Sequence, residues 1–130
     1  MEKSEQEWIS VSDEQNVRTI LRSYGDDEKK NILVSLVGPD LTSNVLRKNN
    51  ISQTSGYRKI KELISDGLIV AKNFVILDGR KFYKHVSVFE DLKINIVKDK
   101  VVVRVKINKE AADTPFMNKL ELDSGGQITV

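Results

Sequence analysis

Polar and cationic side chains crowd the first half of one short stretch, NNISQTSGYRKIKELISDGLIV, at residues 49–70. The amide of Gln53 can hydrogen-bond adenine, and the guanidinium of Arg58 can pair with guanine or with a phosphate. Hydroxyl groups and the free amides of a helix start suit phosphate oxygens. This chemistry is that of a nucleic-acid contact, for which the candidates are Ser52, Gln53, Thr54, Ser55, Tyr57, Arg58 and Lys61.

The rest of the composition argues against catalysis and metal binding. The chain has no cysteine, which excludes disulfides, thiolate nucleophiles and cysteine-ligated zinc, and it has a single histidine, His85. It contains no glycine-rich phosphate loop, no nucleophile with a plausible base and no carboxylate pair flanking a recognisable cleft. We therefore expect no enzymatic activity, no cofactor and no metal.

Charge is distributed unevenly along the chain. Residues 1–30 hold five basic and eight acidic side chains, whereas residues 31–90 hold nine basic and five acidic ones. Any nucleic-acid surface is therefore expected in the middle third. The start, MEKSEQEWIS, is acidic, and no run approaches the ~18 apolar residues that cross a bilayer. We expect a cytoplasmic protein that does not contact a membrane.

Apolar spacing predicts two helices ahead of the polar stretch. The first is expected over residues 13–24, where Ser12 and Gln15 have the spacing of a capping box and Gly25 supplies the stop. Its apolar stripe comprises Val17, Ile20, Leu21 and Tyr24. The second helix follows directly with Asp26 as the expected N-cap. Its expected core face comprises Ile32, Leu33, Leu36 and Val37.

Two further helices are predicted on either side of a short turn at Asn49-Asn50. The first starts with Thr42 as its cap, and the second, over residues 53–66, starts with Ser52 as its cap. Gly56 has no side chain and would let the preceding helix approach closely. The buried side of the pair is expected to comprise Val45, Leu46, Ile60, Leu63 and Ile64.

From Leu68 onward the pattern is that of β-strands. LIVAKNFVIL and KFYKHVSVF flank Asp78-Gly79-Arg80, and Asp-Gly between such runs is a strong hairpin signal. Arg80 and Lys81 at this tip are candidates for contacts with DNA phosphates. LKINIVK and KVVVRVKI alternate around Asp99 and predict a second hairpin with one buried face. It could extend the first sheet, form a dimer surface or bind a partner.

The stretch LTSNVLRKNNISQTSGYRKIKELISDGLIV resembles winged-helix regulators of the ArsR-like group in bacteria and archaea. Leu41-Thr42 matches the opening of the positioning helix, Ser52 to Ser55 the opening of the recognition helix, and Leu63 to Ile69 its closure into the wing. The resemblance covers residues 26–90 and implies a homodimeric transcription regulator that places residues 53–66 in the major groove. Many ArsR-like regulators detect metals through cysteine or histidine clusters, a property that this composition does not support.

The expected fold class is therefore α+β: a winged helix-turn-helix, with a three-helix core and a β-hairpin wing, an N-terminal helix and an additional C-terminal β-hairpin. The expected divisions are an N-terminal arm and possible dimerisation helix at 1–25, the DNA-binding domain at 26–90, the added hairpin at 91–109 and a partly ordered tail at 110–130.

Two assemblies are compatible with these elements. Helix-turn-helix proteins commonly bind two half-sites as dimers, and the first helix precedes the core module, so we expect a homodimer on double-stranded DNA. The candidate dimer contacts are Trp8, Ile9, Val17, Ile20 and Tyr24. The alternative is that this helix completes the monomer's core. The rival function is a winged-helix protein-interaction module in transcription, repair or chromatin machinery.

Overall fold

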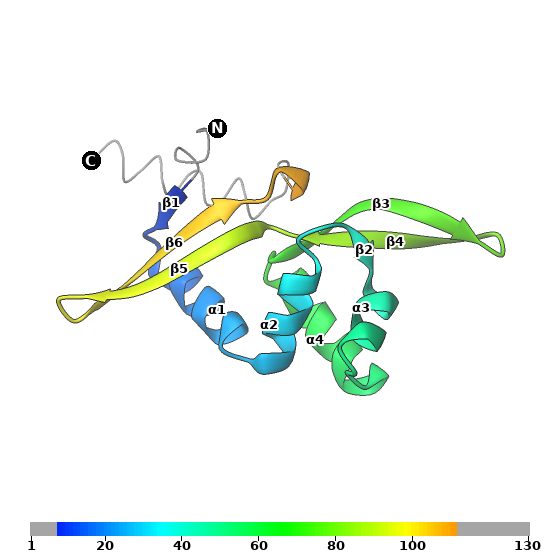
Figure 1. The fold of residues 1–130 in the computed structure, drawn as a ribbon, viewed down its shortest axis with the longest axis horizontal. Helices are drawn as coiled ribbons and strands as arrows, with labels where there is room; N and C mark the ends of the chain where they lie inside the picture. Colours follow the sequence, from blue (N-terminus) through cyan, green and yellow to red (C-terminus); the bar gives the residue numbers. More distant parts are fainter. Residues whose placement is uncertain (1–7, 112–130) are drawn as a thin grey trace.

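The computed structural model describes residues 8–111, which form an α+β fold with four α-helices and two antiparallel three-stranded sheets. The α+β prediction is confirmed. Figure 1 shows two long β-hairpins pointing toward opposite ends of the molecule, with the helices packed beneath them. The elements in chain order are β1 (Trp8–Val11), α1 (Glu14–Tyr24), α2 (Asp27–Ser35), β2 (Asp40–Leu41), α3 (Thr42–Lys48), α4 (Gln53–Ser65), β3 (Ile69–Leu77), β4 (Arg80–Ser87), β5 (Phe89–Val97), β6 (Lys100–Ile107) and the 3₁₀ turn η2 (Lys109–Ala111).

The helix starts follow local capping chemistry. At α2 the Asp26 carboxylate accepts from the backbone N–H of Lys29 at 2.8 Å, as predicted. At α1 the cap is Asp13, not Ser12, since the Asp13 carboxylate accepts from the Asn16 N–H at 2.9 Å. The predicted cap at Thr42 is also wrong. Thr42 is already the first residue of α3, and the preceding Leu41 makes no side-chain capping bond.

One hydrophobic core joins the helices to both sheets. It runs from Ile20 in α1 through Leu33 in α2 and Leu63 in α4 to Val103 and Val105 in β6, all 1% exposed or less. Because these side chains come from both ends of the chain, α1 completes the chain's own core.

Two predicted core residues lie at the surface instead. Val37 is 38% exposed because α2 ends at Ser35, so the helical spacing no longer holds beyond that residue. Ile64 is 43% exposed because it lies about 100° around the helix from the buried Leu63. The apolar stripe of α4 is therefore narrower than the sequence suggested.

The sheet β2-β4-β3 is built around the predicted Asp-Gly hairpin. Asp78 and Gly79 have φ values of 50° and 75°, the positive values at both central positions that a type I′ turn needs. The short strand β2 pairs with β4 through Asp40 opposite His85. This third strand was not expected from the sequence, because a strand of two residues is too short to show the alternation of apolar and polar side chains that predicts a strand.

The sheet β1-β6-β5 contains the second predicted hairpin, whose turn residues Lys98 and Asp99 have φ values of 50° and 70°. It does not extend the first sheet, because its other neighbour is β1, where Val11 lies opposite Val103. The strand β1 was not expected in the N-terminal arm. The hairpin also begins at Phe89 rather than at residue 91.

The predicted tail at 110–130 falls mostly outside the described residues, as does the start of the arm at 1–7. Glu110 and Ala111 end the described part in η2. No helix within residues 8–111 is both long enough and apolar enough to cross a membrane.

Candidate nucleic-acid interface

Helix α4 is fixed against α3 by a close backbone approach. A Cβ added to Gly56 would lie 2.6 Å and 2.8 Å from the two terminal methyls of Leu46, so only glycine fits without a shift. In the turn before it, Asn50 takes a left-handed φ of 56°, and the Ile51 N–H donates to the Leu46 carbonyl at 3.0 Å. The predicted role of Gly56 is confirmed.

The opposite side of α4 carries a row of exposed polar side chains. Ser52 caps the helix, accepting from the Ser55 N–H at 3.3 Å, and Tyr57 is 38% exposed. Buried Ile60 and Leu63 hold the inner side, so this row is turned away from the core. The exposed members of the predicted set are Ser52, Gln53, Thr54, Tyr57, Arg58 and Lys61.

Ser55 does not belong to this outer row, which corrects the prediction for that residue. Its side chain is half-buried, and its hydroxyl donates to the Glu28 carboxylate of α2 at 3.2 Å. Ser55 therefore joins α4 to α2 and is not free to contact a phosphate.

A cluster of ion pairs behind the outer row locks α4 to α2. The Lys59 ammonium lies 2.9 Å from the Asp26 carboxylate and 3.4 Å from that of Glu28. The Lys29 ammonium lies 2.8 Å from the Glu62 carboxylate, which also pairs with Arg58 at 3.5 Å. Sequence reasoning missed Lys59 and Glu62 as positioning residues. Only the i, i+4 spacing of Arg58 and Glu62 offered a local signal.

These contacts shift the pKa values of the residues involved. The backbone hydrogen bond from Lys29, with the side-chain bond from Lys59, lowers the pKa of Asp26 below its ordinary value. The hydrogen bond to Asp26 raises the pKa of Lys59, and the hydrogen bond from Lys29 lowers that of Glu62. All three groups are therefore held charged, and the inner cations are neutralised by acidic partners.

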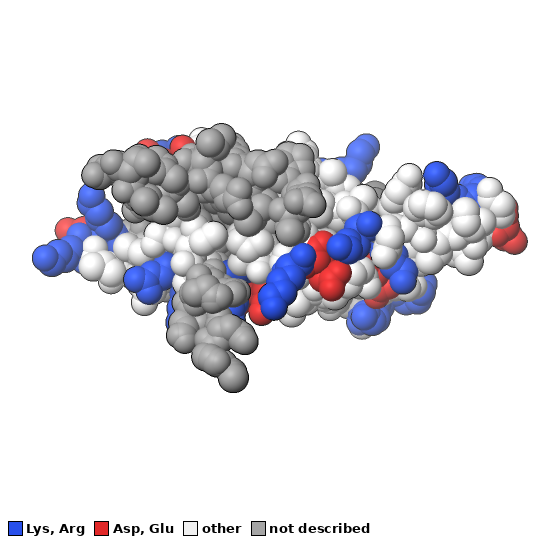
Figure 2. Space-filling model, turned by 90° about the horizontal axis from the view of Figure 1, so that it is seen from above, with Lys and Arg blue, Asp and Glu red and all other residues white. Residues whose placement is uncertain are grey.

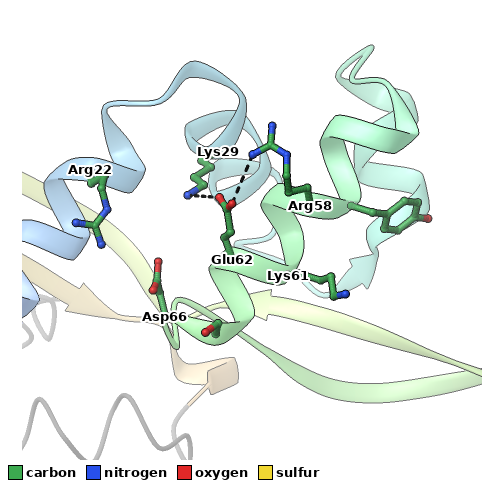
Figure 3. Close-up of a pocket in the computed structure, with 8 residues that line it drawn as sticks. Arg22, Lys29, Arg58, Lys61, Glu62 and Asp66 are labelled. Carbon is green, nitrogen blue, oxygen red and sulfur yellow. Dashed lines mark hydrogen bonds and ion pairs between the residues drawn. The ribbon is translucent and has the colours of Figure 1, made fainter.

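An open groove of about 900 Å³ runs between the end of α1 and the outer side of α4. Its cationic lining residues are Arg22, Lys29, Arg58 and Lys61, and its acidic ones are Glu62 and Asp66. In Figure 3, Arg58 bends toward Glu62, whereas Lys61 points away from α2 with its ammonium free of the dashed contacts. Lys29 and Arg58 pair with Glu62, so the two lining cations outside these ion pairs are Arg22 on α1 and Lys61 on α4.

The tip of the β3–β4 hairpin presents Arg80 and Lys81 beside aromatic rings. The Arg80 guanidinium lies 6.0 Å from the centroid of Phe82, and the Lys81 ammonium lies 4.6 Å from that of Phe74. Phe74 packs edge-on against Tyr83, with ring centroids 5.7 Å apart. Both cations are exposed and available to a polyanion.

Charge on the surface seen from above is mixed. Figure 2 shows lysine and arginine side chains at both ends of the molecule, with carboxylates interspersed among them. The face in that view is therefore not uniformly basic, and positive charge alone does not mark a single interface.

Four of the five predicted dimer contacts lie in or against the core. Ile20 has no exposed surface, which leaves it none for a second copy and corrects the prediction for that residue. Ile9, Val17 and Tyr24 are partly buried against the same core, and burial raises the pKa of Tyr24. The Trp8 ring is covered by the ammonium groups of Lys93 and Lys106, at 4.5 Å and 5.8 Å.

Two kinds of finding bear on the chemistry and the identity of the chain: its possible metal ligands and its similarity to known proteins. Within residues 8–111, no group of three or more histidine, aspartate or glutamate side chains is placed to hold a metal ion. No family model, no curated protein and no solved structure matches the chain. Its function therefore has to be inferred from its own residues.

Proposed function

We propose that this protein is a winged-helix regulator of transcription that binds duplex DNA by placing α4 in the major groove. The order of elements supports the proposal. Helices α2, α3 and α4 pack together, a short turn joins α3 to α4, and the β3–β4 hairpin follows directly. The resemblance of residues 26–90 to ArsR-like regulators points the same way.

The observation that carries the proposal is the two-sided character of α4. A recognition helix must bury one stripe so that its other side can enter a groove. Here Gly56, Ile60 and Leu63 are buried, whereas Gln53, Arg58 and the rest of the outer row are exposed.

Each side chain of the outer row has a role that matches its chemistry. Gln53, the first residue of α4, would pair with adenine, and Arg58 would reach guanine or a phosphate. Ser52 and Thr54, at the amino end of α4, suit phosphate oxygens. Lys61, which lies one helical turn after Tyr57, would contact the DNA backbone. Glu62 holds Arg58 in the free protein, so binding would exchange that exposed ion pair for a contact with DNA.

The β3–β4 hairpin would act as the wing. Arg80 and Lys81 lie on its tip, where they would reach phosphates outside the major groove. Such contacts add affinity and salt dependence but little sequence preference.

Selection of bound duplexes from a random DNA pool tests this proposal. We expect enrichment of one sequence family, because Gln53 and Arg58 would read base edges. As a control, the Gln53→Ala variant should relax the preference at a defined position without abolishing binding. Absence of enrichment at low salt, together with absence of any duplex binding, would contradict the proposal.

A second candidate function is a protein-interaction module, and one observation favours it. The β3–β4 hairpin exposes several large apolar side chains, and patches of this kind often mark protein contacts. They are Phe74, Ile76, Leu77, Phe82 and Tyr83, each at least 40% exposed. A chain that ignores duplex DNA but binds a partner through this hairpin, with loss on Phe82→Ala, would favour this function.

A further inference from the structure

The second hairpin ends in an apolar overhang with an open strand edge. On the face that covers the core, Val103 and Val105 are fully buried, but Ile94 and Ile96 of the same face are 44% and 69% exposed. Figure 1 shows why: the tip of β5 and β6 extends past α1. Among the described residues β5 pairs with β6 and with no other strand, so its second edge is open to another strand along Leu92–Ile96.

We infer that this edge pairs with β5 of a second copy of the chain, joining two three-stranded sheets across a two-fold axis. The inference does not depend on DNA binding. An unpaired edge beside exposed β-branched residues favours pairing with another strand, and a second copy offers an identical edge.

The sequence of β5 favours one of the three registers centred on Lys93, Ile94 and Asn95, the middle of the strand. Antiparallel pairing about an axis perpendicular to the sheet places residues equidistant from the centre opposite each other. Centring the pair on Lys93 would oppose two ammonium groups, and centring it on Asn95 would oppose Asp91 to Asp99. Centring it on Ile94 opposes Leu92 to Ile96 and Lys93 to Asn95, which brings no like charges together.

The same register brings complementary charges together at both ends of the pair. It places Glu90 and Asp91 of one copy alongside the Lys98 and Lys100 turn of the other. Because the two-fold axis relates the two copies, this contact between acidic and basic side chains would occur twice in the dimer, once at each end of the paired strands.

A groove in each copy also matches this register. It has a volume of about 270 Å³ and lies beside the start of β5, lined in part by Leu33, Val34, Val37 and Leu92. Val34 is 61% exposed at its rim. In the Ile94-centred pair, Ile96 of the second copy lies opposite Leu92, on the face that borders this groove. The most exposed apolar side chain of the hairpin would thus cover the exposed apolar groove.

Single cysteines test the register directly, because the natural chain has none. In the full chain, Ile94→Cys should form a disulfide-linked dimer on mild oxidation, since residue 94 faces its own copy at a Cα separation of about 5 Å. Ile96→Cys is the matched control. It is more exposed, yet in this register it lies about 13 Å along the strands from its copy and should not cross-link. Equal cross-linking of both variants would overturn the inference.

The oligomeric state supplies a second, independent readout. At roughly 100 µM, where a micromolar dimer is nearly complete, the wild-type chain of 14.8 kDa should sediment at twice that mass. Ile96→Lys should shift it to the monomer with an unchanged circular dichroism spectrum, because the residue is exposed in one copy. Ile76→Lys, an equivalent change on the β3–β4 hairpin, should leave the dimer intact. A monomeric wild type, or a dimer that persists in Ile96→Lys, would overturn the inference, and the latter would favour a different dimer surface.

Discussion

The two β-hairpins have nearly the same backbone but different surroundings. Each has strands of nine and eight residues and a two-residue turn with positive φ at both positions. Burial in β5–β6 extends to Val103 in the middle of the hairpin, whereas in β3–β4 it is confined to the base, at Ile69 and Val86. The first is flanked by the four-residue strand β1 and the second by the two-residue β2. A hairpin's role therefore depends on what its faces meet, not on its turn.

The exposed apolar residues of the two hairpins differ in kind as well. The end of β3–β4 carries aromatic rings next to Arg80 and Lys81, with cations over two of the rings, in addition to the aliphatic Ile76 and Leu77. The tip of β5–β6 carries β-branched Ile94, Ile96 and Val101. Aromatic rings beside cations suit a polar or charged partner, whereas aliphatic strands suit another strand. This contrast supports the two proposals, that the β3–β4 hairpin contacts DNA and that the β5–β6 hairpin pairs with a second copy.

The largest expected difference between the hairpins is in stability. Val103→Ala should lower the free energy of unfolding by about 2–3 kcal/mol, because it removes two buried methyl groups and leaves a cavity. Ile76→Ala, at an exposed site on the other hairpin, should cost less than about 1 kcal/mol. Urea unfolding at one fixed chain concentration measures both, and equal losses would contradict the contrast in burial.

The next effect concerns the helices beneath both hairpins. Asp26→Ala should cost about 1–2 kcal/mol at neutral pH, because α2 loses its cap and Lys59 its closest partner. The pKa of Asp26 is lower in the folded chain than in the unfolded one, so its contribution is full above the unfolded value and is lost as pH falls through the folded value. The stabilities of the variant and the wild type should therefore begin to converge below about pH 4, and the convergence should be complete only below the lowered pKa of the folded chain.

Asp27→Ala is the matched control for this prediction, since Asp27 lies exposed in the same helical turn and makes no capping bond. It should cost less than about 1 kcal/mol. A difference between Asp26→Ala and wild type that stays constant down to pH 2 would contradict the assigned role of the ionised carboxylate.

A smaller effect distinguishes the two turns. Gly79→Ala should destabilise β3–β4 by about 1 kcal/mol, because φ at this position is 75°. The added Cβ would meet no atom within 4 Å, so the cost comes from the backbone conformation alone. Loss of hairpin amide protection in hydrogen exchange is the measurement, and an unchanged exchange rate would contradict it.

The smallest expected effect has the opposite sign. Asp99→Gly should stabilise β5–β6 by about 0.5 kcal/mol, because Asp99 holds a φ of 70° that glycine adopts more readily. Thermal unfolding should show a slightly higher midpoint. A lower midpoint would mean that the carboxylate of Asp99 stabilises the turn more than its backbone strain costs.

Local signals in the sequence predicted much of this structure. The caps at Asp26 and Ser52 each depend on a residue three positions later, and the close approach at Gly56 depends on Leu46, ten positions earlier in the adjoining helix. The turn at Asp78-Gly79 was equally predictable from its two residues. Each of these contacts is set by a nearby residue type, which is why the sequence pattern was sufficient.

Contacts between distant segments were not predictable in the same way. Ser55 turned inward because Glu28, 27 positions earlier, accepts its hydroxyl hydrogen. Strand β1 exists because β6, more than 90 positions later, offers an edge. A single sequence carries no signal for such pairings, so the outer row of α4 was predicted correctly except where a long-range partner intervened.

The central claim is that α4 binds duplex DNA. Its most direct test is the salt dependence of duplex binding, measured for a double charge removal on α4 and for a matched one away from α4. Arg58→Ala/Lys61→Ala removes the Lys61 contact with a phosphate and the Arg58 contact with guanine or a phosphate. It should lower the slope of log affinity against log salt by about 1 to 2, with a marked loss of affinity at low salt. Arg104→Ala/Lys109→Ala removes the same charge from exposed positions in β6 and η2 and should leave slope and affinity nearly unchanged. If both pairs changed the slope equally, or if neither did, α4 would not be the DNA-binding surface.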